Sequence, residues 1–244
     1  MELSVDLLNL QSGIGVTRGY RQYATRGMRY IIPHSSKPLV HAGTFLNGSH
    51  CDIALLTEVD GGSRRSKYIS QLDTLKESTS FTDGYFFPTR SLGNSINEGN
   101  GILSLYPLER NRTHPLPSAT NPRVLGESRI TIKGIPITLF VAHLALRTET
   151  RSLQIKRIGE ILSSTSTPIL LGGDFNERDA KKFRLLTNIG LSFITAPGYP
   201  SWKPIHSLQV LFYSSHFEAH NAFTNKDTLF SDHLPLHIDL TFTA

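Results

Sequence analysis

Short apolar stretches and segments with helical spacing alternate along the whole chain. The apolar stretches are rich in Val, Ile, Leu and Phe and end near Gly, Pro, Asn or Asp, as strands in globular proteins do. Most of them fall within the usual strand length of roughly 4 to 8 residues. We therefore expect strands over residues 3–9, 53–57, 85–87, 102–106, 128–132, 137–142, 169–172, 208–213 and 234–241.

Helical spacing of apolar residues marks a smaller number of segments. Tyr68, Leu72 and Leu75 are one example, because they fall on one face of a helix. Strands outnumber these helices, and Lys133-Gly134 forms a short turn between two of the strands. A doubly wound parallel sheet would need a helix after almost every strand, so the pattern favours an α+β layered sandwich. Helices are expected over residues 39–47, 67–77, 149–162 and 179–188.

The composition fits an ordinary folded protein of 244 residues. Hydrophobic residues make up 39% and charged residues 18%, which excludes fibrous and intrinsically disordered proteins. No low-complexity stretch or charge block divides the chain, so we expect a single domain over residues 1–244. A formal net charge of +5 favours anionic partners, namely nucleic acid, phosphorylated substrates or an acidic lipid surface, and nothing indicates a protein partner.

Cysteine usage and the first residues bear on the cellular compartment. The one cysteine, Cys51, cannot form a disulfide within the chain. The first residues lack the basic region of a signal peptide, and no apolar run approaches the roughly 18 residues of a membrane span. We therefore expect a cytoplasmic protein.

Residues 13–37 differ from the rest of the chain because they are basic and aromatic. They contain no acidic residue, and Tyr20, Tyr23 and Tyr30 lie between the basic side chains. Such a segment can bind the backbone of nucleic acid and stack on its bases, or bind an anionic headgroup. It can equally be a surface excursion whose tyrosines cover the edge of a sheet. The candidate substrate-binding residues in it are Arg18, Arg21, Arg26 and Arg29.

Acidic and amide residues follow two of the expected strands. Glu58 comes directly after the strand at 53–57, where a carboxylate can bind Mg²⁺ or simply face the solvent. Asp174 and Asn176 follow the strand at 169–172. There the carboxylate can accept a proton from water and the amide can donate to a phosphate oxygen, although Gly, Asp and Asn also form ordinary turns.

Histidines and a further carboxylate lie at the ends of other strands. Asp232 and His233 precede the last expected strand, and an Asp-His pair can act on a metal ion or transfer a proton near neutral pH. His143 follows the strand at 137–142, and Asn9 ends the first strand. Strand ends are exposed at the rim of a layered protein, so we expect these side chains at such a rim.

Four motifs occur in an order and spacing that resemble those of a known family. They are LLTEVD, FVAHL, GGDFN and SDHLPL, with GNGILSLYPL at residues 99–108 between the first two. Together they resemble the endonuclease/exonuclease/phosphatase superfamily, whose best-known fold is that of deoxyribonuclease I, and in particular its uncharacterised bacterial members. The resemblance implies a four-layer α/β/β/α sandwich of two packed sheets flanked by helices. It also implies hydrolysis of phosphoester bonds, with Mg²⁺ or Mn²⁺ as the cofactor, at one rim of the sheets.

The resemblance also implies metal and substrate contacts for individual residues. Glu58 would bind the metal ion, Asn9 would assist it from the first strand, and Asp232 would lie near the metal. Asn100, in the GNG stretch, is a candidate for substrate binding together with the arginines of residues 13–37.

The catalytic roles implied by the resemblance belong to four residues. Asp174 would orient or deprotonate the attacking water, and Asn176 would grip the phosphate through its amide. His143 and His233 would stabilise the transition state.

One position departs from the family pattern. Members commonly carry an aspartate in the strand before SDH, where its carboxylate orients the catalytic histidine, and here the matching residue is Gln209. An amide can still accept a hydrogen bond from an imidazole N–H, but it does not favour the charged imidazolium. By analogy with Ser-His-Asp triads, the loss of rate can reach about 10⁴-fold.

The motifs leave the substrate open because one site serves many phosphoesters. The basic charge and the Arg/Tyr-rich segment favour a nuclease that acts on DNA or RNA. The alternatives are a phospholipid or sphingomyelin-type phosphodiesterase, a phosphoinositide phosphatase or an enzyme for a soluble phosphoester. A binding protein that holds an anionic ligand without turning it over is a further alternative, supported by Gln209 alone.

Overall fold

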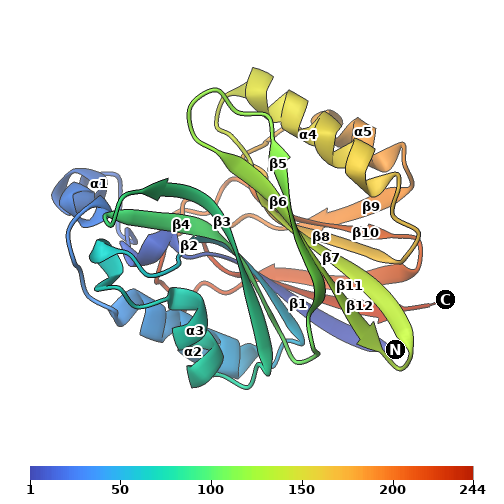
Figure 1. The fold of residues 1–244 in the computed structure, drawn as a ribbon, viewed down its shortest axis with the longest axis horizontal. Helices are drawn as coiled ribbons and strands as arrows, with labels where there is room; N and C mark the ends of the chain where they lie inside the picture. Colours follow the sequence, from blue (N-terminus) through green and yellow to red (C-terminus); the bar gives the residue numbers. More distant parts are fainter. Residues whose placement is uncertain (244) are drawn as a thin grey trace.

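The computed structural model describes residues 1–243. Two six-stranded sheets pack face to face, and helices cover the outer face of each sheet (Figure 1). The expected four-layer α/β/β/α sandwich is therefore confirmed.

The first sheet is mixed and is built around the N-terminal strand. It contains β1 (Glu2–Asn9), β2 (Ile53–Asp60), β3 (Asp83–Leu92), β4 (Ile96–Ser104), β11 (Phe217–Thr224) and β12 (Leu236–Phe242). The strand order is β11-β12-β1-β2-β4-β3, with β1 parallel to β2 and antiparallel to β12. Both central strands are buried at nearly every position because each has one face on the second sheet and the other under helices.

The second sheet repeats this plan with a parallel pair at its centre. It contains β5 (Glu109–Leu116), β6 (Arg123–Ile132), β7 (Ile135–His143), β8 (Ile169–Asp174), β9 (Leu191–Thr195) and β10 (Gln209–Ser214). The order is β5-β6-β7-β8-β10-β9, with β7 parallel to β8. Lys133 and Gly134 join β6 to β7 as a two-residue turn, and both have the positive φ that a type I′ hairpin requires.

Helices cover the two outer faces and one end of the molecule. In Figure 1 α2 (Lys37–Ser49) and α3 (Gln71–Ser78) lie against the first sheet, and α4 (Thr148–Leu162) and α5 (Arg184–Thr187) against the second. The short helix α1 (Arg21–Arg26) lies apart, at the end of the sheets where β2 and β4 are labelled. Within residues 1–243, no helix combines the length and the apolar character needed to cross a membrane. Four 3₁₀ turns complete the order: η1 (Gln11–Gly13), η2 (Gly27–Tyr30), η3 (Arg64–Ser66) and η4 (Ala180–Phe183).

The main core lies between the two sheets, and a smaller one lies under each pair of helices. Leu7 and Leu55 of the first sheet pack against Leu139 and Leu211 of the second. Gly172 allows this close approach, because a Cβ at its position would lie 2.6 Å from side-chain carbons of both Leu7 and Leu55. The sheets are thus held at a fixed distance, and their strand ends form a stable rim.

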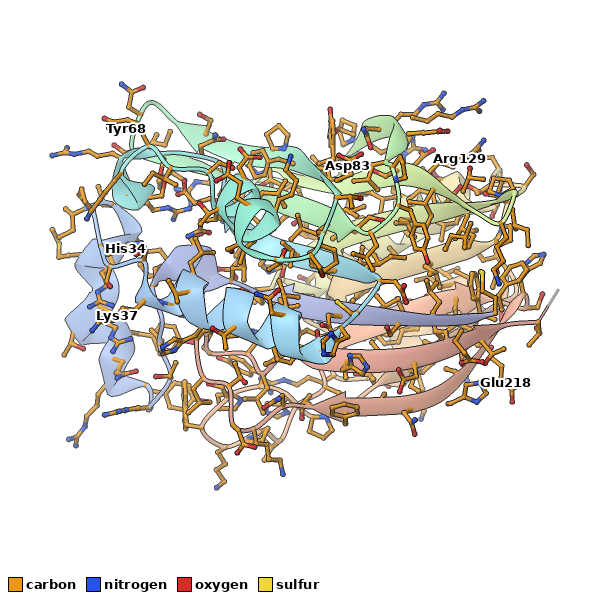
Figure 2. The ribbon with its side chains drawn as sticks, turned by 90° about the horizontal axis from the view of Figure 1, so that it is seen from below. His34, Lys37, Tyr68, Asp83, Arg129 and Glu218 are labelled. Atoms are coloured by element: carbon orange, nitrogen blue, oxygen red, sulfur yellow. The ribbon has the colours of Figure 1, made fainter. Side chains whose placement is uncertain are left out.

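The two ends of the layered structure differ in character. Residues 13–37 gather at one end, where Figure 2 shows His34 and Lys37, and Glu218 lies at the opposite end. At that opposite end the Met1 ammonium group donates to the carbonyl of Phe242 over 3.0 Å. Because Asn9 ends β1, this strand runs from the pair formed by residues 1 and 242 towards the end that carries residues 13–37.

Every expected strand overlaps an observed one, and the deviations have physical causes. The expected helix at 67–77 begins only at Gln71, because Lys67 and Tyr68 have positive φ and Ser70 caps the helix through the Asp73 amide. The segment 179–188 divides into η4 and α5, and α1 was not expected. The strand expected at 102–106 covers residues 96–104, and the short one at 85–87 extends over all of β3. The apolar pattern does not predict β5, β9 and β11, which are edge strands.

Candidate active site

Glu58 lies at an irregularity of β2. The pairing of β2 with β4 shifts in register between Leu56 and Val59, and Glu58 has a positive φ of 52°. Such a bulge changes the direction in which a side chain points, and bulges are frequent beside active sites. Here it directs the Glu58 carboxylate into the cavity described below.

Asp174 ends β8, between two neighbouring strands of the second sheet. The register places it beside His143 of β7 on one side and beside Gln209 of β10 on the other. The preceding residue, Gly173, has φ 144°, and a Cβ there would lie 2.0 Å from the carbonyl oxygen of Ala142. Only glycine fits this approach, so the GGD sequence fixes where the carboxylate emerges.

One oxygen of Asp174 is the meeting point of the site. Its Oδ2 lies 3.1 Å from Nδ2 of Asn9, 3.5 Å from Nε2 of His233 and 3.9 Å from Nε2 of His143. The Asn9 amide also donates to Oε1 of Glu58 over 3.1 Å. Asn9 therefore joins a carboxylate of the first sheet to one of the second, and the expected convergence of these side chains is present.

Asn176 is held in a tight turn after β8. It has φ 51°, its backbone N–H donates to Oδ1 of Asp174 over 3.0 Å, and its Nδ2 donates to the Leu144 carbonyl over 2.9 Å. One hydrogen of its side-chain amide is thus used within the protein, and the other is available for a ligand.

Asp232 is linked to the basic segment at residues 13–37. The Tyr23 hydroxyl donates a hydrogen bond to Oδ2 of Asp232, and Oδ1 accepts from the Ser231 hydroxyl over 3.1 Å. Burial and the Asp232 charge raise the pKa of Tyr23, so its hydroxyl stays protonated and donates. This contact brings α1 to the rim of the sheets.

These groups surround a cavity of about 520 Å³. It also contains residues that the sequence pattern does not single out, including three arginines, Arg123, Arg151 and Arg178, together with Tyr199. Arg178 is part of the GDFNER stretch and could have been noticed there, whereas Arg123 and Tyr199 reach the cavity only through the tertiary fold. The lining residues are Tyr23, Glu58, Arg123, His143, Leu146, Arg151, Asp174, Asn176, Glu177, Arg178, Tyr199, Leu208, Asp232 and His233.

The carboxylates of the cavity repel one another. Burial, followed by the charges of Glu98 and Asp232, raises the pKa of Glu58 to about 8, against the smaller opposing effects of Asn9 and Arg123. Burial, together with the charges of Arg123 and His233, holds the pKa of His143 well below its usual value. His143 is therefore neutral at physiological pH, and a cation beside Glu58 would relieve the repulsion between acids.

The donor atoms fit a divalent cation that keeps part of its water shell. Residues 1–243 contain no group of three His, Cys, Asp or Glu side chains placed to hold a metal ion. Mg²⁺ does not need one, because it commonly binds one or two carboxylates together with water and substrate phosphate. Asn9 offers its N–H group to Glu58, and its oxygen accepts from the Gln11 amide over 2.9 Å. In this arrangement Asn9 positions Glu58 through its N–H group, and one lone pair of its oxygen is already used by the Gln11 amide.

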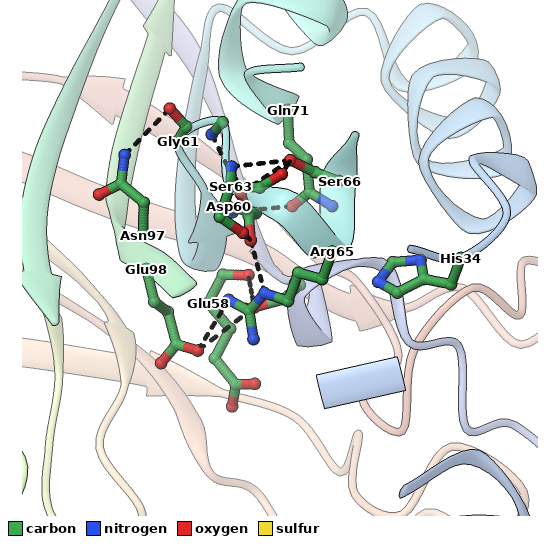
Figure 3. A network of polar contacts seen from close by, with 12 residues as sticks. His34, Glu58, Asp60, Gly61, Ser63, Arg65, Ser66, Gln71, Asn97 and Glu98 are labelled. Carbon is green, nitrogen blue, oxygen red and sulfur yellow. Dashed lines mark hydrogen bonds and ion pairs between the residues drawn. The ribbon is translucent and has the colours of Figure 1, made fainter. Parts of the chain in front are cut away.

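A buried network of ion pairs and hydrogen bonds around Arg65 connects to the backbone of Glu58 (Figure 3). Arg65, 1% exposed, donates to Asp60 over 2.5 Å, to the Ser12 hydroxyl over 2.8 Å and to Glu98 over 3.2 Å. Ser12 in turn donates to the Glu58 carbonyl over 3.2 Å. Burial alone would raise the pKa of Asp60, but its hydrogen bonds with Arg65 and neighbouring serines lower it overall. Asp60, which follows Glu58 in the LLTEVD motif, is thus part of the support of the site.

Gln209 makes no hydrogen bond with His233, the histidine that it was expected to orient. It is 3% exposed, and its Nε2 donates to the carbonyl of Leu7 over 3.0 Å. Nδ1 of His233 is buried and has no hydrogen-bond partner within residues 1–243. The amide therefore bridges the two sheets, and the imidazole lacks the acceptor that the family pattern provides.

The expected substrate-binding residues are placed unequally. Asn100 is 1% exposed and donates to the Val124 carbonyl over 3.3 Å, so it connects β4 to β6 and does not line the cavity. Arg18 and Arg21 are exposed on the segment that Tyr23 attaches to the rim. Arg29 donates to a backbone carbonyl of its own segment, and burial together with Arg29 and Arg18 lowers the pKa of Arg26.

Solved structures share the fold over nearly the whole chain. An endonuclease/exonuclease/phosphatase from Beutenbergia cavernae has a TM-score of 0.75 at 16% identity and covers 100% of this chain and 72% of its own. The catalytic domain of human nocturnin with bound sulfate has a TM-score of 0.74 at 20% identity, covering 99% and 94%. A mannosyl-6-phosphatase from Bacteroides thetaiotaomicron has a TM-score of 0.73 at 16% identity, covering 98% and 100%.

The family itself is shown by the sequence. No curated protein matches the chain closely. The profile of the Endonuclease/Exonuclease/phosphatase family, however, matches residues 10–233. The chain therefore belongs to this family, whose members are phosphoester hydrolases.

Proposed function

We propose that the protein is a Mg²⁺- or Mn²⁺-dependent phosphodiesterase that cleaves nucleic acid. The observation that carries the proposal is the meeting of an amide and two histidines on one oxygen of Asp174, within a cavity that also holds Glu58 and Asp232. Acid and base groups gathered around one point of a cavity are typical of hydrolytic sites.

A cation would be held by Glu58, beside Asp232. When bound, it neutralises charge on the phosphate and acts as a Lewis acid. The raised pKa of Glu58 supports this assignment. Its carboxylate form is unfavourable in the protein alone, and a bound cation would stabilise that form. Asn9 keeps the Glu58 carboxylate in place by donating to Oε1.

Asp174 is suited to accept the proton of the attacking water at Oδ2. Asn9 and the Asn176 amide hold its two oxygens, so the carboxylate cannot rotate away. His143 and His233 present Nε2 to the same point, where they can donate to phosphoryl oxygens. The free hydrogen of the Asn176 side chain can donate there as well.

Nucleic acid is favoured over other phosphodiesters by the charges next to the cavity. Arg123 and Arg178 line it, and residues 13–37 contribute basic side chains and no acid. Because Tyr23 attaches this segment to Asp232, its exposed arginines lie close to where a phosphate backbone would pass.

The test is a parallel assay with Mg²⁺ or Mn²⁺, with and without chelator, on single-stranded DNA, RNA, plasmid DNA and sphingomyelin vesicles. Bis-p-nitrophenyl phosphate serves as a general diester, and Asp174→Asn is the matched inactive control. We expect nucleic acid to be cleaved only with metal and only by the unsubstituted protein. Cleavage of lipid alone would contradict the choice of substrate. Hydrolysis no faster than that of Asp174→Asn on every substrate would contradict the enzymatic function.

A further inference from the structure

Two segments far apart in the chain form an aromatic wall at the catalytic cavity. We define the aromatic wall as Tyr20 and Tyr23, from residues 13–37, together with Tyr199 and Trp202, from the loop before β10. Tyr23 and Tyr199 line the cavity, and Tyr20 and Trp202 continue the wall outward. The sequence pattern indicates the first segment only, because nothing in the sequence shows that the second segment lies next to it.

The rings of the wall form two groups, one packed against His233 and one attached to Asp232. The Tyr199 ring lies 4.7 Å from that of His233 at 42°. Tyr23, whose hydroxyl is bonded to Asp232, stacks on Tyr20 at 6.4 Å and 22°. These contacts fix the inner part of the wall relative to the reacting groups, so a ligand lying on the wall is also aligned with the cavity.

The outer part of the wall is an open corner. Tyr20 and Trp202 meet at 5.2 Å with their planes at 90°, and Tyr20 is 65% exposed. Two perpendicular rings can hold a third flat ring, which stacks on one of them and touches the edge of the other. An exposed aromatic corner next to catalytic groups would be costly in water without a ligand that covers it.

The charges around this corner identify the chemical class of the ligand. Residues 13–37 contain no acidic residue, and neither do residues 198–206, which include Lys203. Arg18 and Arg21 flank Tyr20 and are exposed. A flat ring attached to a negatively charged chain fits both features, and single-stranded nucleic acid has this chemistry because its bases are free to stack on side chains.

We infer that the aromatic wall binds an unpaired nucleobase next to the scissile phosphate, so that the enzyme prefers single-stranded nucleic acid to duplex. The inference rests on the proposed function for its phosphodiester, but the wall can be tested without catalysis. In a duplex both faces of each base are already stacked, so a base must leave the helix before the Tyr20–Trp202 corner can receive it.

Trp202 makes a direct binding test possible because it is the one tryptophan of the chain. Its fluorescence is titrated, in chelator, with oligothymidylate and with an abasic oligomer that has the same number of phosphates. We expect saturable quenching by oligothymidylate and binding at least about 5-fold weaker for the abasic oligomer, since stacking on one aromatic ring corresponds to roughly 5- to 150-fold in affinity. Equal binding of the two oligomers would overturn the inference.

Substitutions at Tyr20 separate ring stacking from charge. Tyr20→Ala should weaken binding of oligothymidylate at least about 5-fold, whereas Tyr20→Phe should keep it. The matched control is Tyr68→Ala, because Tyr68 is also 65% exposed but stacks on no aromatic ring within residues 1–243. Unchanged binding by Tyr20→Ala, or an equal loss in Tyr68→Ala, would contradict the role of the wall.

The same titration distinguishes failure of this inference from failure of the proposed function. Quenching by oligothymidylate without hydrolysis of any nucleic acid would keep the wall and refute the nuclease. Hydrolysis of nucleic acid with equal binding of the abasic oligomer would keep the nuclease and refute the wall. A response to sphingomyelin vesicles but not to oligothymidylate would overturn the inference in favour of a lipid surface.

Discussion

Two buried clusters of histidine and carboxylate side chains differ in how fully their polar atoms are hydrogen-bonded. On β12, His237 lies between Asp6 and Asp239, with its ring nitrogens 2.7 and 3.1 Å from their oxygens. The Ser49 hydroxyl donates to the second oxygen of Asp6 over 2.5 Å. In the proposed catalytic cavity the imidazole nitrogens lie 3.5 to 3.9 Å from the carboxylate oxygens, beyond good hydrogen-bond distance.

The pKa values of the histidines in the two clusters are also shifted in opposite directions. The hydrogen bond and charge of Asp6 raise the pKa of His237, against the effect of burial, so that imidazole is easily charged and paired. His143 has its pKa lowered, and the nearby Glu58 has its pKa raised to about 8. A cluster that satisfies its own groups stabilises the fold, whereas one that leaves charges unbalanced is suited to bind something else.

The largest expected effect comes from removing the shared carboxylate of the catalytic cluster. Asp174→Asn should lower kcat/KM by about 10³-fold with Mg²⁺, because the water loses its proton acceptor. The free energy of unfolding should fall by only about 1 kcal/mol, since the substitution keeps the shape and disturbs one of the two hydrogen bonds that the carboxylate accepts. Hydrolysis of bis-p-nitrophenyl phosphate and urea denaturation measure the two quantities. A large loss of stability would show that Asp174 stabilises the fold, as the His237 cluster on β12 does.

Asp6→Asn should give the opposite result. It removes the charge from a buried partner of His237 and should lower the free energy of unfolding by about 3 kcal/mol. The activity per folded molecule should stay the same, because Asp6 lies outside the catalytic cavity. Urea denaturation together with active-site titration tests this. Reduced turnover in fully folded protein would show that the clusters are coupled.

Gln209→Asp should give His233, in the cluster of the proposed catalytic cavity, the hydrogen-bond acceptor that it lacks. His233 has a buried Nδ1 without a partner, and a carboxylate on β10 would supply an acceptor and favour the charged imidazole. We expect kcat to rise about 10-fold, which corresponds to roughly 1.4 kcal/mol in the activation barrier. Gln209→Asn is the control, because it shortens the side chain without adding charge. An equal change in both variants would exclude a role for the carboxylate.

The smallest expected effect is the pH dependence of the β12 cluster. The pKa of His237 is raised in the folded protein, so the folded state binds the proton more tightly than the unfolded state does. Its contribution to stability is full below the unfolded pKa of about 6.5 and is lost as the pH rises through the higher folded value. The difference in unfolding free energy between the protein and His237→Gln should therefore shrink from about pH 6 to pH 9. A difference independent of pH would contradict the ion pairing.

Most side chains of the candidate site could be predicted from the sequence, whereas most contacts between them could not. Glu58, Asp174 and His233 belong to motifs at strand ends, where position along the chain already suggests a shared rim. The contact between Tyr23 and Asp232 joins residues separated by 209 positions and depends on how a loop without apolar periodicity folds back. For the same reason Arg123 and Tyr199 could not be selected from the sequence.

Prediction of the fold failed mainly at the edges of the sheets. Central strands such as β2 and β8 are buried on both faces and begin with continuous apolar runs, IALL and ILL. The edge strands β5 and β11 carry charged or polar residues at many positions, β5 also contains Pro115, and β9 is only five residues long. Polar residues and proline protect an edge from pairing with other chains. The same residues interrupt the apolar pattern from which a strand is predicted.

The pairing of β1 with β12 has a practical consequence for handling the protein. Residues 1 and 242 are hydrogen-bonded neighbours, and the eight residues of β1 put roughly 25 Å between them and the catalytic end at Asn9. A fusion partner, affinity tag or solid support attached at that end would leave the cavity and the aromatic wall facing outward. A short peptide joining residues 1 and 242 would also close the chain into a circle, so that new ends could be opened elsewhere without stretching the first sheet.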